Sequence, residues 1–229
     1  MTAFALRLIA LVSMLMDHIY HAFLPDQLWL HCIGRLAFPI FAFQLATGYC
    51  LTHSKRSYAL RLALFALLSE VPFDLMAYGT PFYPGHQNVM WTLLLGFLVI
   101  HLTEKALQMN SDRTVRIVII FFVVFLPATA ASALCLDYGY LGIVQIFVFY
   151  VLRNKSRVLQ TFCILLINLL MGGAGIPVAG IQLPIQGLAV LAMIPILLYN
   201  GRQGPKGKAW TRFCYIFYPA HLLILALFA

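Results

Sequence analysis

Charged residues are scarce in this sequence. Asp, Glu, Lys and Arg make up 10% of the 229 residues, and 62% of the residues are hydrophobic. A typical soluble domain carries about 25% charged residues, so this composition excludes an ordinary soluble protein. Apolar runs of about 20 residues, the length that a helix needs to cross a bilayer, recur along the whole chain. We therefore predict an all-α, polytopic membrane helix bundle that forms a single domain over residues 1–229 within a lipid bilayer.

Several recognisable motifs are missing as well. The five cysteines are scattered and include no CxxC pair, so they indicate neither a disulfide framework nor a metal site, and we predict no metal. No P-loop, dinucleotide-binding fingerprint, HExxH or GxSxG motif is present. The net charge of +8 would suggest nucleic acid in a soluble protein. Here the basic residues lie in the loops, where they orient membrane spans, and we predict no nucleic-acid partner.

The loops predict the topology. Lys and Arg occupy every second loop, while the intervening loops contain neither residue. Cytoplasmic loops carry this excess, so the N-terminus should be cytoplasmic and, with an odd number of spans, the C-terminus outside. We expect about nine spans, at 5–24, 28–52, 57–78, 88–107, 114–134, 139–152, 157–172, 181–199 and 210–228.

The first span carries ionisable residues deep inside an apolar run. Arg7 and His18 lie about three turns apart on nearly the same face, roughly 16 Å along the axis. Asp17 is adjacent to His18 but points about 100° away. Ionisable side chains in a membrane are costly and usually face a bundle interior or an aqueous path. This stripe is suited to a long ligand with an anionic head and a reactive tip.

Other spans place polar residues at a similar depth. We expect one layer near the midplane or outer half of the bundle, formed by Asp17, His18, Arg35, Glu70, Asp74, Asn88 and His221. A structural alternative is that Arg35 forms an ion pair with Asp17, Glu70 or Asp74 without a catalytic role, since an incomplete buried pair is destabilising. Four other histidines are expected to be ordinary core residues: His31, His53, His86 and His101.

Three motifs in this order carry a resemblance to a known family. They are GRLAFPIFAF at 34–43, SEVPFD at 69–74 and YIFYPAH at 215–221. Together with Asp17-His18, Arg61, Gln87-Asn88 and Trp91-Thr92, the chain resembles the TraX family over almost its whole length. The resemblance implies acetylation of a pilin N-terminus in the conjugative members. The R-x10-H spacing of Arg7 and His18 is also similar to a first-span motif of acyltransferase-3 proteins, in which that histidine is regarded as essential.

The implied reaction is acetyl transfer from cytoplasmic acetyl-CoA to an amine or hydroxyl. Phosphates of the CoA head require cations, and the candidates are Arg7, Lys55, Arg56, Lys208 and Arg212. His18 is the candidate general base, because imidazole exchanges protons near neutral pH. Glu70 or Asp74 is the expected orienting carboxylate. Oxyanion donors would come from Arg35, Asn88 or His221. A covalent acetyl-histidine remains an alternative to direct transfer.

Two other classes of function remain open. A proton-coupled transporter also uses buried Asp, Glu and His residues, although the sequence lacks inverted repeats and paired broken spans. In a non-catalytic assembly factor, the polar layer would serve helix packing alone. The sequence does not identify the acceptor, which the resemblance leaves as a pilin subunit, an envelope glycan or a small amine. The resemblance implies the bacterial cytoplasmic membrane as the location.

Overall fold

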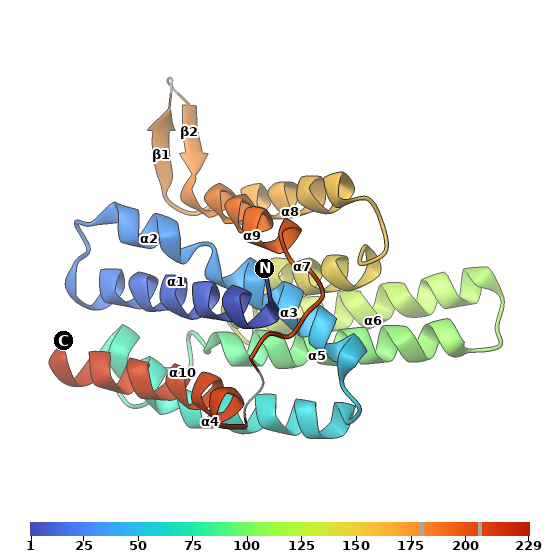
Figure 1. The fold of residues 1–229 in the computed structure, drawn as a ribbon, viewed down its shortest axis with the longest axis horizontal. Helices are drawn as coiled ribbons and strands as arrows, with labels where there is room; N and C mark the ends of the chain where they lie inside the picture. Colours follow the sequence, from blue (N-terminus) through green and yellow to red (C-terminus); the bar gives the residue numbers. More distant parts are fainter. Residues whose placement is uncertain (179–180, 206–207) are drawn as a thin grey trace.

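The computed structural model describes residues 1–178, 181–205 and 208–229. Almost all of the secondary structure in these residues is helical (Figure 1). The α-helices are α1 (Ala3–Phe23), α2 (Leu28–Gly34), α3 (Ala37–Leu51), α4 (Lys55–Tyr78), α5 (Val89–Gln108), α6 (Arg113–Ala133), α7 (Gly139–Val151), α8 (Arg157–Met171), α9 (Met193–Leu197) and α10 (Lys208–Phe228). An antiparallel hairpin of β1 (Gly175–Val178) and β2 (Ile181–Pro184) leads into the 3-10 helix η1 (Ile185–Ala192). The predicted helical fold class is confirmed.

Several helices have the length and composition of membrane spans. Among the described residues there are four such segments, Ala3–Phe23, Leu28–Leu51, Val89–Gln108 and Arg113–Ala133. Helix α6 also presents a large apolar face to the exterior, with Phe121 57% and Leu126 58% exposed. A continuous apolar exterior is suited to lipid contact. The structure therefore supports a membrane protein with several apolar helices.

Two predicted spans differ from the structure. The span expected at 28–52 divides into α2 and α3 at Arg35 and Leu36. Pro39 lies in the first turn of α3, where its missing N–H would have no partner within the helix. The continuous span expected at 181–199 is wrong, because this segment starts as a strand and continues as η1 and the short α9. Strand pairing of Ile181–Pro184 with Gly175–Val178 prevents a helix from starting at 181.

Helix α1 lies between two sets of helices (Figure 1). It contacts α2 and α3 on one side and α10 on the other, and α10 packs along α4. The core between these helices is apolar, with Leu6, Phe38, Tyr49 and Leu222 essentially removed from solvent. Within a bilayer, such side chains stabilise the bundle mainly through van der Waals packing between the helices. The first and last helices of the chain are thereby neighbours.

Gly34 determines how closely α2 approaches α1. A Cβ atom at this position would lie 2.4 Å from Cβ of Asp17, which is closer than side-chain atoms can approach. Glycine therefore allows the two backbones to come together. The close approach brings the following residue, Arg35, to the carboxylate of Asp17.

Candidate functional site

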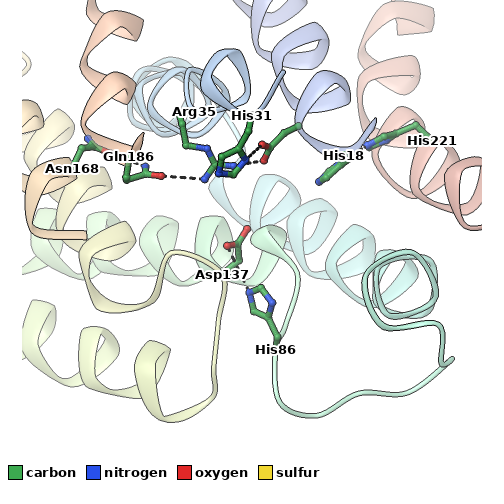
Figure 2. Close-up of polar contacts among 9 residues, drawn as sticks. His18, His31, Arg35, His86, Asp137, Asn168, Gln186 and His221 are labelled. Atoms are coloured by element: carbon green, nitrogen blue, oxygen red, sulfur yellow. Dashed lines mark hydrogen bonds and ion pairs between the residues drawn. The ribbon is translucent and has the colours of Figure 1, made fainter. Parts of the chain in front are cut away.

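Asp17 holds the first polar cluster together. Its Oδ2 pairs with a guanidinium N–H of Arg35, and its Oδ1 accepts a hydrogen bond from Nδ1 of His31 at 2.7 Å. His31 and Arg35 lie one turn apart at the end of α2, so both reach the same carboxylate (Figure 2). Of the three carboxylates expected as possible partners of Arg35, the structure pairs it with Asp17. His31, expected to be an ordinary core histidine, belongs to this cluster.

His18 and His221 form the second polar group. Nδ1 of His18 lies 2.7 Å from Nε2 of His221, across 203 residues of sequence. Nδ1 of His221 lies 2.6 Å from the carbonyl oxygen of Phe217. A carbonyl only accepts, so His221 Nδ1 carries a proton, and in the neutral ring its Nε2 accepts. His18 must then donate from Nδ1, which leaves Nε2 of His18 unprotonated.

A chain of buried amides extends from Arg35 toward α8. Arg35 donates to Oε1 of Gln186 at 3.1 Å, and Gln186 donates to Oδ1 of Asn168 at 2.9 Å (Figure 2). Asn168 donates in turn to Oε1 of Gln145 at 3.1 Å. Nε of Arg35 is buried and lacks a partner within the described part of the chain. The guanidinium is held on one side and retains a donor that a ligand can use.

Glu70 and Asn88 form a separate group. Asn88 caps α5 through the N–H of Met90, at 3.0 Å, and its amide donates to Glu70, which also accepts from the indole N–H of Trp91 at 2.8 Å. Asp74 accepts the backbone N–H of Tyr83 at 2.8 Å and orders the loop after α4. The predicted single layer of polar residues is therefore divided into separate groups around Asp17, His18 and Glu70. His18 hydrogen-bonds His221, rather than the expected Glu70 or Asp74.

His86 lies in the loop between α4 and α5, facing Asp137. Its Nε2 is 3.7 Å from a carboxylate oxygen of Asp137 (Figure 2). Its Nδ1 is 2.7 Å from the hydroxyl of Tyr78. The nearby carboxylate of Asp137 raises the pKa of His86 above its ordinary value, against the opposing effect of partial burial. The loops at this end of the bundle are further joined by backbone hydrogen bonds between Gln87 and 135–137.

A cavity of about 670 Å³ opens beside α1. Its lining begins near Ala3 and Gln203 and extends to Met14 and Tyr218. Met14 lies one turn before His18, and Tyr218 lies one turn before His221. Arg7, Arg61 and Gln44 supply polar groups to the wall, and Nε of Arg7 donates to Oε1 of Gln44 at 3.3 Å. The remaining lining is mostly apolar and aromatic. Its deep end reaches Tyr218, whose ring centroid is 6.4 Å from that of His18.

The predicted cofactor-binding cations do not all reach this cavity. Arg7 lines it, and so does Arg61, which was not among the predicted cations. Lys55 instead pairs with Glu104, which also accepts from the hydroxyl of Tyr49 at 2.5 Å. Arg56 and Arg212 are exposed and do not line the cavity. The side chain of Lys208 lies outside the described residues.

A second cavity, of about 450 Å³, opens near the hairpin. His31, Arg35 and Gln186 line it on one side, and Asp137 and Tyr138 line it on another. The wall also includes 170–174, the segment that leads into β1. Arg35 thus belongs both to the Asp17 cluster and to the wall of this cavity.

The family model for TraX protein matches residues 3–229 of this chain. The chain belongs to the TraX family. It is similar to the probable fimbrial assembly protein FimC, serogroup H1, of Dichelobacter nodosus, with 26% identity over 239 residues, 98% of this chain and 94% of the relative. It is also similar to Protein TraX of Escherichia coli, with 26% identity over 232 residues, 98% of this chain and 86% of the relative. No solved structure gives a significant match.

Sequence reasoning missed several polar residues of this TraX-family site. His31 could have been found from its position one turn before Arg35, a spacing that points both side chains in one direction. Asn168, Gln145 and Gln186 are polar residues inside apolar stretches, which is itself a signal of buried hydrogen bonding. Their connection to Arg35 depends on packing between α2, α8 and η1, for which the sequence contains no local signal.

Proposed function

We propose that this protein is a membrane-embedded acetyltransferase that uses cytoplasmic acetyl-CoA. The observation that supports it most is the large cavity, which extends from Arg7 and Arg61 at one end to within one turn of the His18–His221 pair. A wall that combines two arginines with a largely apolar lining fits a ligand with a phosphate-rich head and a long arm. Bound acetyl-CoA would supply the activated acetyl group as a thioester. Arg7 and Arg61 would hold its phosphates.

His18 is proposed as the general base. Its free Nε2 accepts the proton of an attacking amine or hydroxyl, while His221 holds Nδ1–H and fixes the tautomer. This is the role that an orienting partner plays for a catalytic histidine. The proton returns to the leaving sulfur, so the two proton transfers balance. Direct transfer needs no bond between acetyl and His18, whereas the covalent acetyl-histidine alternative would use the same free Nε2.

Arg35 is the proposed source of oxyanion stabilisation. Its guanidinium is fixed by Asp17 and Gln186, and its buried Nε retains a donor. A fixed positive donor stabilises negative charge that develops on a carbonyl oxygen. We assign the acceptor to the second cavity, because Arg35 lines that cavity and does not line the donor cavity. Asn88 and Glu70, bonded to each other, are assigned a structural role.

The proposed topology places the N-terminus and the donor cavity on the cytoplasmic side. The N-terminal end of α1 bonds the segment before α10, with Ala3 N–H donating to the carbonyl of Arg202 at 2.9 Å. Lys55, at the start of α4, pairs with Glu104, near the end of α5, and both helix ends adjoin loops with basic residues. This arrangement supports a multi-pass protein of about nine crossings, in the cytoplasmic membrane of a bacterium. The eighth crossing would be the broken segment that includes η1 and α9.

The acceptor is proposed to be a component of a pilus or of the envelope. One relative carries the name fimbrial assembly protein, which supports a pilin subunit, and an envelope glycan is the alternative acceptor. A proton-coupled transporter or a non-catalytic assembly factor would use the same polar residues, but neither accounts for a cavity that is lined by two arginines and ends at Met14 and Tyr218, one turn from the His18–His221 pair.

The decisive experiment measures acetyl-CoA binding and release of free CoA by the purified protein in detergent. Wild type, Arg7→Ala and His18→Ala are compared, with the exposed Arg56→Ala as the matched control. We expect Arg7→Ala to weaken binding, and His18→Ala to bind normally but release CoA at least about 100-fold more slowly. Folded wild-type protein without acetyl-CoA affinity would refute the proposal. Accumulation of a ligand in vesicles without acetyl-CoA would support transport instead.

A further inference from the structure

Three potential metal ligands converge at the end of α1. The side chains of Asp17, His21 and His31 each offer one ligand atom, and these atoms lie within 4.8 Å of one another. Asp17 and His21 are one turn apart on α1, so both project from one face of the helix. His31 reaches them from α2. The sequence spacing predicted no metal, because the third ligand comes from a different helix.

We propose that Asp17, His21 and His31 bind a divalent transition-metal ion of the zinc type. Two imidazoles and a carboxylate form a ligand set that Zn²⁺ accepts, with bonds of about 2.0–2.2 Å and a fourth position left for water or another ligand. Oδ1 of Asp17 and Nδ1 of His31, now 2.7 Å apart, would separate slightly and share the ion in place of the proton. Binding of the ion does not require acetyl transfer, although Asp17 also holds Arg35, the proposed oxyanion donor.

The surroundings support ligation at this position. Oδ2 of Asp17 is bound by Arg35, which is held in turn by Gln186 at 3.1 Å. Partners of this kind orient ligating carboxylates in metal sites. The ring of His31 stacks on Tyr20, with centroids 4.8 Å apart, and lies edge-on to His21 at 5.2 Å. His31 is thus fixed in place, whereas His21 is exposed and open to an arriving ion.

The proposed metal site, with its open coordination position, lies beside the second cavity. His31 and Arg35 both line the second cavity, so an ion at this cluster would lie at its wall. The carboxylate of Asp137 lines the same cavity and offsets part of the positive charge of Arg35 and the ion. The ion would also fasten the end of α1 to α2, because its ligands come from both helices.

The test uses the full-length protein in detergent, without a histidine tag, after treatment with a chelator. Co²⁺ is titrated alone and its visible absorption is recorded, followed by competition with Zn²⁺. Wild type should bind one equivalent with the absorption of a tetrahedral site. His21→Ala should lose affinity by at least about 10-fold, and His21→Cys should restore binding with an added sulfur-to-cobalt charge-transfer band.

His53→Ala is the matched control, because His53 is another exposed histidine outside this cluster. It should bind Co²⁺ as wild type does. His21 is exposed, so its replacement leaves the apolar core intact, and circular dichroism should be unchanged. Wild type that binds no stoichiometric Co²⁺, or equal affinity of wild type and His21→Ala, would overturn the proposal.

Discussion

His221 fixes the tautomer of His18. The two ring nitrogens are 2.7 Å apart, and the other nitrogen of His221 donates to the carbonyl of Phe217. His18 therefore donates to His221, and His221 donates to the backbone carbonyl. When both rings are neutral, Nε2 of His18 is the ring nitrogen whose lone pair stays available. A histidine placed by another histidine differs from the carboxylate-oriented arrangement that the sequence predicted.

This relationship predicts different outcomes for two replacements of His221. The amide oxygen of Gln in His221→Gln can accept from Nδ1 of His18, whereas Phe in His221→Phe fills the space without accepting. We expect His221→Phe to lower kcat for CoA release by about 100-fold or more, and His221→Gln to retain a larger share. KM for acetyl-CoA should change little in either variant. Equal kcat for the two variants would refute the orienting role.

Arg61 provides a test of donor binding. It lines the large cavity beside Arg7, whereas Arg56 lies on the same helix and does not line the cavity. Arg61→Gln should raise KM for acetyl-CoA by about 10-fold, the effect of losing one charge-assisted hydrogen bond of about 1.5 kcal/mol. Arg56→Gln should leave KM unchanged. Steady-state kinetics at two salt concentrations distinguish the variants, and matching values for both would exclude Arg61 from donor binding.

Gly34→Ala tests the close approach of α1 and α2. The added Cβ would meet the Asp17 side chain at 2.4 Å, so the helices must move apart. We expect a loss of about 1–3 kcal/mol in stability, visible as a lower Tm. Gly48→Ala is the milder control, since its nearest neighbour would be the Tyr58 ring at 3.3 Å. A larger loss for Gly48→Ala would contradict the role of Gly34.

Gln186 links Arg35 to the buried amides of α8. Gln186→Leu removes an acceptor from Arg35 and a donor from Asn168, which leaves two buried polar groups incomplete. Such losses cost about 1–3 kcal/mol each, so a clear decrease in Tm is expected. The double variant Gln186→Leu/Asn168→Leu should lose less stability than the sum of the losses of the single variants. Each single variant leaves the other residue without its hydrogen-bond partner, whereas the double variant removes both members of the pair. Additive losses would argue against the link.

The His86–Asp137 pair predicts a dependence of stability on pH. The pKa of His86 is raised in the folded protein, so its protonated form is favoured by folding. The stabilisation is complete below the ordinary pKa of histidine and is lost as pH rises through the raised value. Both side chains are about one-third exposed (36% and 32%), so the effect should be at most about 1 kcal/mol. Thermal unfolding of wild type should show it, and His86→Gln should abolish it.

Much of the helical framework was predictable because long apolar runs determine it directly. The bounds of α1, α4 and α6 lie within a few residues of the predicted spans. The break between α2 and α3 was not predicted, because residues 28–52 read as one apolar run. The prediction of one span at 181–199 was wrong for a different reason. The first residues of this segment pair with β1, an interaction between segments that hydropathy does not describe.

The polar residues of the site were easier to find than their partners. Asp17, His18, Arg35 and His221 are conspicuous in the sequence because ionisable side chains are rare in membrane spans. Which carboxylate Arg35 meets depends on the approach of α2 to α1 at Gly34, and that approach is a property of three-dimensional packing. The same applies to His31, which joins the cluster only because α2 folds back along α1.

The contact between α1 and α10 also affects how the protein is made. Helix α1 leaves the ribosome first, and His18 then has no hydrogen-bond partner until α10 is inserted near the end of synthesis. Pairing across so much sequence carries a large loop-closure entropy and tends to slow folding. The contact of α1 with α10 is therefore absent during most of membrane insertion. A chain interrupted before α10 would leave His18 without this hydrogen bond, an unfavourable state for a polar side chain within a membrane.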